Sequence, residues 1–276
     1  VVPGFASIGG RRPSDQTTQK DLLSAAEAMK ISPAPAPLSV AAASASEPAA
    51  PKAGLELMEG DTVVKLSGMR KVVAERMLHS HTEIPPVTQN TKVDVTELMK
   101  IRKYSVNDLI LKATAKMLRQ HPEILVSYDN GQMIQRAHVN IGMAVALEAG
   151  LIVPVIRDAD RLGLDALADS AKDLASRAKG NKLLPDEYKG STFSVSNLGM
   201  FGIETFTPIV NQPDAAILGV CAVQDELTLA EDGSVSKRQV MRLSFTYDHR
   251  LIDGATAAKF VMDLRDLLQS PMCIVL

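Results

Sequence analysis

The octapeptide YDHRLIDG, residues 247–254, places a histidine and an aspartate four residues apart, directly after a strand-like run. In the preceding VMRLSFTYDH, apolar and polar residues alternate, which is the pattern of a half-buried strand. Continuing that alternation puts His249 on the apolar face, pointing into the interior or into a cleft. An imidazole placed there can act as a general base if a substrate proton comes within reach.

Asp253 is the acid nearest to this histidine in the sequence. It can accept a hydrogen bond near the imidazole, or pair with an arginine such as Arg70 or Arg76 and so stiffen the turn. The residues after Gly254 have helical apolar spacing, so Asp253 also stands where a helix N-cap is expected. The structural alternative is a satisfied core histidine beside a simple cap, and spacing alone favours that alternative.

Ser196 is the second candidate, near the end of the strand-like STFSVSN, residues 191–197. A hydroxyl at a strand end can donate a hydrogen bond into a site, although facing water is the commoner fate of serine. No GxSxG elbow surrounds Ser196, so we do not expect a serine nucleophile.

The remaining histidines and the cysteines give weaker signals. His79 and His81 lie together without a cysteine or carboxylate cluster, so we expect no metal site. Cys221 and Cys273 stand in apolar stretches, which predicts small buried side chains rather than a disulfide. A hydrolase that uses Cys221 as its nucleophile is a further functional hypothesis, and it requires a reactive, exposed thiol.

The composition bounds the class of protein. The chain has 276 residues, 46% of them hydrophobic, and a formal net charge of −2, which gives no reason to expect a nucleic acid or a charged membrane as partner. No apolar run approaches a membrane span and no signal-peptide pattern is present, so we expect a soluble intracellular protein. Because the first residue is Val, we expect it to be part of a longer chain.

The elements that must position these residues begin after an Ala/Pro/Ser-rich stretch. Residues 32–54 predict a flexible linker, residues 1–31 hold one short helical candidate, and residues 55–276 read as one domain. Apolar spacing predicts helices over 68–83, 105–123, 164–179 and after 254, and a strand followed by a helix with Thr96 as its cap. Strands are expected over 137–147, with 150–160 as hairpin partner, and over 191–197, 215–224 and 240–249. The fold class is therefore α/β, a mixed sheet with helices packed on it.

The motifs DHRLIDG and SNLGMFGIETFTPIVNQPDAAILGV resemble the catalytic domain of the dihydrolipoamide acyltransferases, the core components of 2-oxo acid dehydrogenase complexes. LSGMRKVVAERM, SVNDLILKA and GLIVPVIRDAD add to the resemblance, which runs from about Asp61 to Leu276 in the order of the family. It implies the two-layer fold of chloramphenicol acetyltransferase and a homotrimer with each active site between two chains. The linker fits the tethers on which family members carry lipoyl and subunit-binding domains.

The resemblance also implies roles for single residues. His249 would take the proton from the thiol of coenzyme A or dihydrolipoamide, and Ser196 would donate to the oxyanion formed when the thiolate attacks a thioester. Asp253 occupies a position filled by Asp or Asn in the family, so orienting the turn is its implied role. His249 and Ser196 would come from different chains. Phe206 and Leu218 are implied to line the acyl or lipoyl passage.

The implied function is acetyl transfer between a dihydrolipoyl thiol and coenzyme A, because SNLGMFGIETFTPIVN is similar to the pyruvate-type members. An acetoin-cleaving complex and a non-catalytic core-like scaffold remain alternatives. The implied partners are a 2-oxo acid decarboxylase and dihydrolipoamide dehydrogenase, with the lipoyl group on a domain that these residues do not include. The core can be a trimer, a 24-mer or a 60-mer, in a bacterial cytoplasm or, for a eukaryotic chain, the mitochondrial matrix.

Three departures from the family pattern stand out. Family members usually have about a dozen further residues between Lys103 and Tyr104. Many have a histidine where Pro86 stands. The opening GGRRPSDQTTQKDLL resembles only the tail of a subunit-binding domain, so these residues are not expected to bind partner enzymes alone.

Overall fold

The structure is a computed structural model that describes residues 56–66, 68–147, 150–229 and 232–275. Residues 63–276 form one structural unit, and the described residues before it, 56–62, hold a turn in which the Met58 amide donates to the Asp61 carboxylate. The predicted subunit-binding remnant, 1–31, and linker, 32–54, lie outside the described residues. No helix within the described ranges combines the length and the apolarity that a membrane crossing needs.

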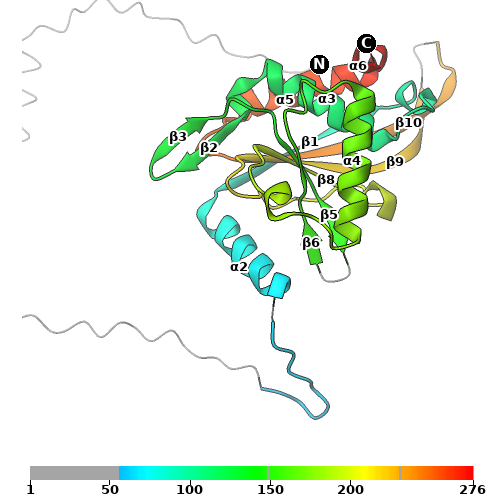
Figure 1. The fold of residues 1–276 in the computed structure, drawn as a ribbon. Coiled ribbons are helices and arrows are strands. Elements are labelled where there is room, and N and C mark those ends of the chain that lie inside the picture. The colour runs from blue at the N-terminus through cyan, green and yellow to red at the C-terminus, as the bar shows by residue number, and fades with distance from the viewer. Residues whose placement is uncertain (1–55, 67, 148–149, 230–231, 276) are drawn as a thin grey trace, which may run out of the picture. The chain divides into compact units, whose positions relative to one another are not determined.

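A six-stranded mixed sheet carries the unit (Figure 1). Its order is β1, β10, β9, β8, β4, β7, with β1 at Pro86–Asp94, β10 at Val235–Asp248, β9 at Ala216–Leu229, β8 at Phe193–Asn197, β4 at Ile141–Met143 and β7 at Val155–Ile156. Strand β8 runs parallel to β9 and β4, and the other pairs are antiparallel. Two small ribbons pair β2, Val126–Asp129, with β3, Gln132–Gln135, and β5, Val145–Leu147, with β6, Gly150–Ile152. The predicted mixed sheet is confirmed.

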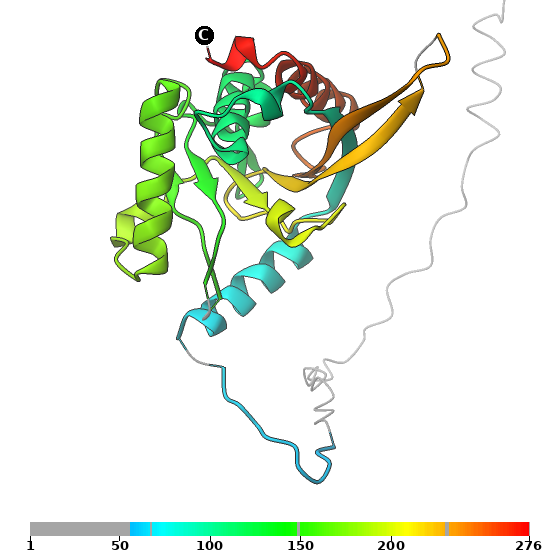
Figure 2. The same ribbon diagram turned by 90° about the vertical axis from the view of Figure 1, so that its right-hand side faces the viewer.

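Helices cover one face of this sheet. Helix α3, Val106–Gln120, and α5, Gly254–Gln269, lie beside each other over the sheet, and α4, Leu164–Lys179, packs along α3 (Figures 1 and 2). Ser105 and Asp108 form a capping box at the start of α3, because each side chain bonds the other residue's amide. Helix α2, Gly68–Glu83, precedes β1, and α6, Met272–Val275, follows α5. The predicted helices over 68–83 and 164–179 are confirmed.

The main core lies between the sheet and helices α3 and α5. Its aromatic centre joins Phe193 and Phe245 of the sheet to Phe260 of α5, with the rings of Phe245 and Phe260 5.1 Å apart. Tyr247 stacks on Phe245 at 5.4 Å and is fully buried. Packing of this kind stabilises the fold beyond area burial alone and fixes where β10 ends.

The second face of the sheet corrects one expectation. Strand β10 was predicted to be half-buried, yet its polar residues Ser244, Thr246 and Asp248 are also buried. Their polar atoms are satisfied by Asn90, Thr88 and Arg250, respectively. Residues 202–215 contribute to covering this face, where the Phe206 side chain packs against Gly219 and Val210 clusters with Ile217. Alternation in the sequence shows two chemically different faces, but not that both are covered.

The expected helix after Thr96 is also wrong. Only a 3-10 turn, Leu98–Lys100, forms there, and the Thr96 hydroxyl donates to Asp94 instead of capping a helix. The chain has few residues between this turn and the cap of α3 at Ser105, so a longer helix has no room.

Candidate active site

His249 lies one residue beyond the end of β10, in the turn that leads into α5. Its amide donates to the carbonyl of Pro85 at 3.1 Å, and its ring lies 5.9 Å from the ring of Tyr247. The predicted placement on the apolar face is therefore confirmed by the Tyr247 contact. Of the two predicted directions, the interior is wrong for the single chain, because His249 is exposed, and a cleft stays a prediction.

Asp253 is the N-cap of α5. Its carboxylate accepts hydrogen bonds from the Thr256 amide at 2.8 Å and the Thr256 hydroxyl at 3.1 Å. The Thr256 amide is the first cause of a pKa below the usual aspartate range, and the proximity of His249 contributes a smaller lowering. Of the roles considered for Asp253, the N-cap is the one formed within one chain, and its described hydrogen bonds run to Thr256 and not to Arg70 or Arg76.

The neighbours of His249 along the chain turn to the other side. Asp248 is buried and forms a bidentate ion pair with Arg250, with the shortest contact at 2.7 Å. The Arg250 guanidinium also lies 4.1 Å from the centre of the Tyr128 ring. The predicted divergence of Asp248 and Arg250 from His249 agrees with this arrangement, which anchors the turn from its far side.

Ser196 lines a pocket of about 730 Å³ at the end of β8. Apolar side chains dominate its walls, contributed by Met143, Val145, Leu151, Met200, Phe201, Val223 and Met241. The next residue, Asn197, accepts from the Gly199 amide at 2.9 Å and donates to Asn107 at the start of α3 at 3.1 Å. The strand end that carries Ser196 is thus held by hydrogen bonds on both sides, beside a space that an acyl chain can enter.

Ser196 and His249 do not meet within one chain. Ser196 is level with Gly219 on β9 and Ser244 on β10, so His249 lies two strands across and five residues along. Strand spacings of about 4.8 Å and a rise of about 3.3 Å per residue put the two Cα atoms roughly 19 Å apart. The side chains also take opposite faces, because Ser244 and Tyr247 are an odd number of residues apart.

Phe206 and Leu218 separate in the structure. The Phe206 ring occupies the space above Gly219, where an added Cβ would come within 2.8 Å of it. Since Gly219 is level with Ser196, Phe206 lies over the same row of the sheet. Leu218 points to the other face and is fully buried in the main core. Leu218 does not line the Ser196 pocket, so its place beside an acyl passage stays a prediction.

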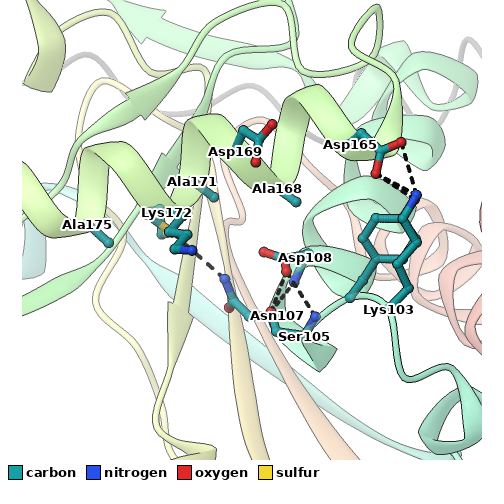
Figure 3. A pocket seen from close by; sticks show the side chains of 12 residues that line it. Lys103, Ser105, Asn107, Asp108, Asp165, Ala168, Asp169, Ala171, Lys172 and Ala175 are labelled. Atoms are coloured by element: carbon teal, nitrogen blue, oxygen red, sulfur yellow. Dashed lines mark hydrogen bonds and ion pairs between the residues drawn. The ribbon is translucent and has the colours of Figure 1, made fainter.

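A second pocket, of about 490 Å³, lies between the start of α3 and α4 (Figure 3). It adjoins the Ser196 pocket through the shared residues Asn107, Met143 and Ala175. At its mouth Asp165 accepts from Tyr104 at 2.9 Å and pairs with Lys103 at 2.8 Å, and the Lys103 contact lowers the pKa of Asp165. Contacts to α4 thus hold the junction of Lys103 and Tyr104.

A buried carboxylate, missed in the sequence, lies on the Ser196 face of the sheet. Asp214 accepts from the hydroxyls of Ser194 at 2.6 Å and Ser191 at 2.9 Å, and burial raises its pKa to about 7. These contacts tie the end of residues 202–215 to β8. The sequence signal was an aspartate inside the apolar QPDAAILGV, whose partners 20 and 23 residues away could not be assigned.

The other candidate groups stay outside this site. Cys221 is buried as predicted, and burial raises its thiol pKa, whereas Cys273 is exposed, contrary to prediction. His121 contacts Glu123 and Asp263, and His138 contacts Asp158. His79 lies in a pocket with Tyr128, away from His249's side of the turn.

Three features together define a candidate acyl-transfer domain. They are a mixed sheet with helices on one face, a histidine in a strand-to-helix turn and a serine beside an apolar pocket. Residues 58–276 match the family of the 2-oxoacid dehydrogenases acyltransferase catalytic domain, and the chain belongs to this family.

Relatives and solved structures agree with this membership. The chain is 37% identical over 99% of its length to the dihydrolipoyllysine-residue acetyltransferase component of the mitochondrial pyruvate dehydrogenase complex of Schizosaccharomyces pombe, covering 58% of that protein. It is 37% identical to the acetyltransferase component of the acetoin cleaving system of Bacillus subtilis, over 77% of this chain and 56% of that one. It is 36% identical to the mitochondrial pyruvate dehydrogenase protein X component of Mus musculus, over 76% and 44%. The chain thus spans about half the length of the curated relatives it matches.

Two solved structures share the fold of this chain over most of its length. One comes from a study of a serine, a histidine and an asparagine in the catalytic mechanism of Azotobacter vinelandii dihydrolipoamide acetyltransferase, with a TM-score of 0.76 and 35% identity over 81% of this chain and 99% of that one. The other is the cubic core of a pyruvate dehydrogenase multienzyme complex, with a TM-score of 0.74 and 35% identity over the same shares.

Proposed function

We propose that this chain transfers an acetyl group between a dihydrolipoyl thiol and coenzyme A, and that it builds the oligomeric core of a 2-oxo acid dehydrogenase complex. The observation that carries the proposal is the arrangement of His249 and Asp253 in one turn, with Ser196 beside an apolar pocket at the other end of the sheet. The serine, histidine and asparagine of the Azotobacter vinelandii enzyme correspond in type and order to these three residues, with aspartate in place of asparagine.

In the proposed reaction, His249 accepts the proton of the attacking thiol and the thiolate sulfur bonds to the thioester carbonyl carbon. The carbonyl oxygen becomes an oxyanion, to which Ser196 donates a hydrogen bond. When this intermediate collapses, the carbon–sulfur bond to the first carrier breaks and the departing sulfur takes back the proton from His249. A thiol with an ordinary pKa of about 8.5 and an imidazole of about 6.5 differ by roughly 2.7 kcal/mol, which positioning can offset.

The proposed site needs two chains. His249 is exposed and about 19 Å from Ser196 of its own chain by strand geometry, so a neighbouring chain must supply the serine. A homotrimer provides three equivalent contacts of this kind. In that arrangement Phe206 borders the acyl group, because its ring lies over Gly219, the residue paired with Ser196. Leu218 only supports the strand.

Acetyl is the proposed acyl group, because the Schizosaccharomyces pombe and Bacillus subtilis relatives are both acetyltransferase components. The acetoin-type relative makes a complex that cleaves acetoin the second candidate. A non-catalytic core-like protein is the third candidate, since the name of one relative, the protein X component, states no transferase activity. The presence of His249 and Ser196 together favours a catalyst over that scaffold.

The proposed partners are a 2-oxo acid decarboxylase, dihydrolipoamide dehydrogenase and a domain that carries the lipoyl group. The similarity to a cubic core supports a higher-order assembly, which we propose is built from trimers. The proposed compartment is the bacterial cytoplasm, or the mitochondrial matrix if the chain is eukaryotic.

The experiment that tests the proposal follows acetyl transfer from acetyl-coenzyme A to free dihydrolipoamide by the purified protein and its His249→Ala variant. We expect transfer by the wild type and a loss of about 10²–10⁴-fold in kcat for the variant. Light scattering is used to check that the wild type and the variant have the same oligomeric state. An oligomeric wild type that transfers no acetyl, propionyl or longer acyl group contradicts the proposal and favours the scaffold.

A further inference from the structure

One amide side chain ties together the two ends of the octapeptide that carries His249. Gln89, on β1, donates from its side-chain nitrogen to the hydroxyl oxygen of Tyr247 at 3.2 Å and to the carbonyl oxygen of Gly254 at 2.9 Å. Tyr247 is the first residue of YDHRLIDG and Gly254 is the last. Both donors of the amide group are therefore used to close this segment.

The three elements that Gln89 joins are the ones that surround His249. Strand β10 ends just before it, α5 begins five residues after it, and β1 pairs with β10 along its whole length. The His249 amide also bonds to Pro85, the residue directly before β1. The segments on both sides of the histidine are thus hydrogen-bonded to the same edge strand, β1, or to the residue directly before it.

The orientation of the His249 ring depends on how its backbone and the neighbouring Tyr247 ring are held. Among the described residues its ring contact is with Tyr247, at 5.9 Å between ring centres, and the hydrogen bonds of Asp253 go to Thr256. Tyr247 cannot shift freely, because it is fully buried and stacked on Phe245. Its hydroxyl, held by Gln89, fixes the ring against which the imidazole lies.

We infer that Gln89 is a positioning residue for His249, acting through Tyr247 and the carbonyl of Gly254. This inference rests on the proposed function, because it assigns to Gln89 the orientation of the proposed base. A displacement of about 1 Å at a base can cost about 10²-fold in rate, and Gln89 is not among the residues proposed to contact a substrate. The effect of losing Gln89 should therefore fall on kcat and not on KM.

The test compares Gln89→Leu, Tyr247→Phe and the double variant in the assembled protein, with acetyl-coenzyme A and dihydrolipoamide as substrates. Gln89→Leu removes both hydrogen bonds, and we expect kcat to fall about 10- to 100-fold with KM for each substrate within about twofold of the wild type. Tyr247→Phe removes one bond and keeps the ring, so we expect a smaller fall. The double variant should be no slower than Gln89→Leu, because both changes break one network.

Gln224→Leu is the matched control. Gln224 is also a half-buried glutamine of the sheet whose amide donates to a partner, Glu204, but it lies far along β9 from the octapeptide. We expect this variant to keep wild-type kcat, which separates loss of a sheet amide in general from loss of this one.

The outcomes are distinct. A Gln89→Leu protein that keeps kcat within twofold overturns the positioning role while leaving the proposed function intact. If Gln89→Leu does not assemble, Tyr247→Phe decides, and an unchanged kcat there overturns the role. Equal losses in kcat and in thermal stability for Gln89→Leu and Gln224→Leu also overturn it. A wild type that transfers no acyl group overturns both the proposed function and this inference.

Discussion

Ser196 and His249 lie on opposite faces of the same sheet, two strands apart and five residues out of register. No side-chain motion closes a gap of roughly 19 Å within a packed sheet. If both residues serve one reaction, each complete site must combine a histidine from one chain with a serine from another.

This relationship predicts complementation between two inactive variants. His249→Ala and Ser196→Ala should each lose activity, the serine variant by about 10²–10³-fold in kcat. In mixed trimers formed by coexpression in equal amounts, about one quarter of the interfaces combine an intact histidine with an intact serine. We therefore expect about a quarter of the wild-type activity per chain. A mixture as inactive as its components would show that the two residues do not share a site.

Asp253 is predicted to act as a cap rather than as a charge. Asp253→Asn keeps the hydrogen bond to the Thr256 amide, so we expect nearly unchanged stability and transfer activity. Asp253→Ala should lower the free energy of unfolding by about 1 kcal/mol. Urea unfolding measures the stability of both variants, and acetyl transfer measures their activity. Ser105→Ala removes the cap of α3, away from the turn, and is the control for a loss of stability alone. A large loss of activity in the Asn variant would show that the negative charge is needed.

Asp214 predicts a pH-dependent stability. Burial raises the pKa of this carboxyl to about 7, so the folded protein holds a proton that the unfolded chain releases near pH 4. Stability attributable to this group is therefore full below pH 4 and is lost as the pH rises towards 7, by up to about 1.4 kcal/mol per pH unit.

The Asp214→Asn variant should lack this slope, since it cannot ionise. We expect the difference in melting temperature between variant and wild type to shift in favour of the variant as the pH rises from 4 to 7. The hydrogen bonds from Ser194 and Ser191 and the charge of Arg136 lower the pKa of Asp214, and the value of about 7 already includes their effects. Asp169→Asn, on the exposed side of α4, is the control, and parallel pH curves for wild type and Asp214→Asn would contradict the prediction.

Phe206 and Leu218 should differ in what their removal changes. Leu218→Ala creates a cavity in the main core and should cost 2–5 kcal/mol of stability, a range of about that size being typical of buried leucines. Phe206→Ala instead uncovers Gly219 beside Ser196, so we expect the kcat/KM for butyryl- relative to acetyl-coenzyme A to rise about tenfold. Denaturation and an acyl-donor series measure the two effects. A change of acyl preference in Leu218→Ala alone would reverse our assignment.

Local patterns in the sequence were sufficient for much of the fold. The helices over 68–83 and 164–179, the hairpin-linked strands and the Asp253 cap all follow from apolar periodicity and end signals, which act within a few residues. The family motifs likewise directed attention to His249 and Ser196. The helix expected after Thr96 failed because the space available to it depends on the next element, a property that periodicity does not contain.

The sequence by itself determined the family, the type of sheet and the residues that can do chemistry. Only the tertiary structure decided which side chains meet: Gln89 reaches residues 158 and 165 positions away, Asp214 is buried against two serines, and Leu218 faces the core instead of a pocket. It also decided that Ser196 and His249 stay apart in one chain. The physical reason is that side-chain type and spacing act locally, whereas strand order, register and the covering of each face arise from packing between distant segments.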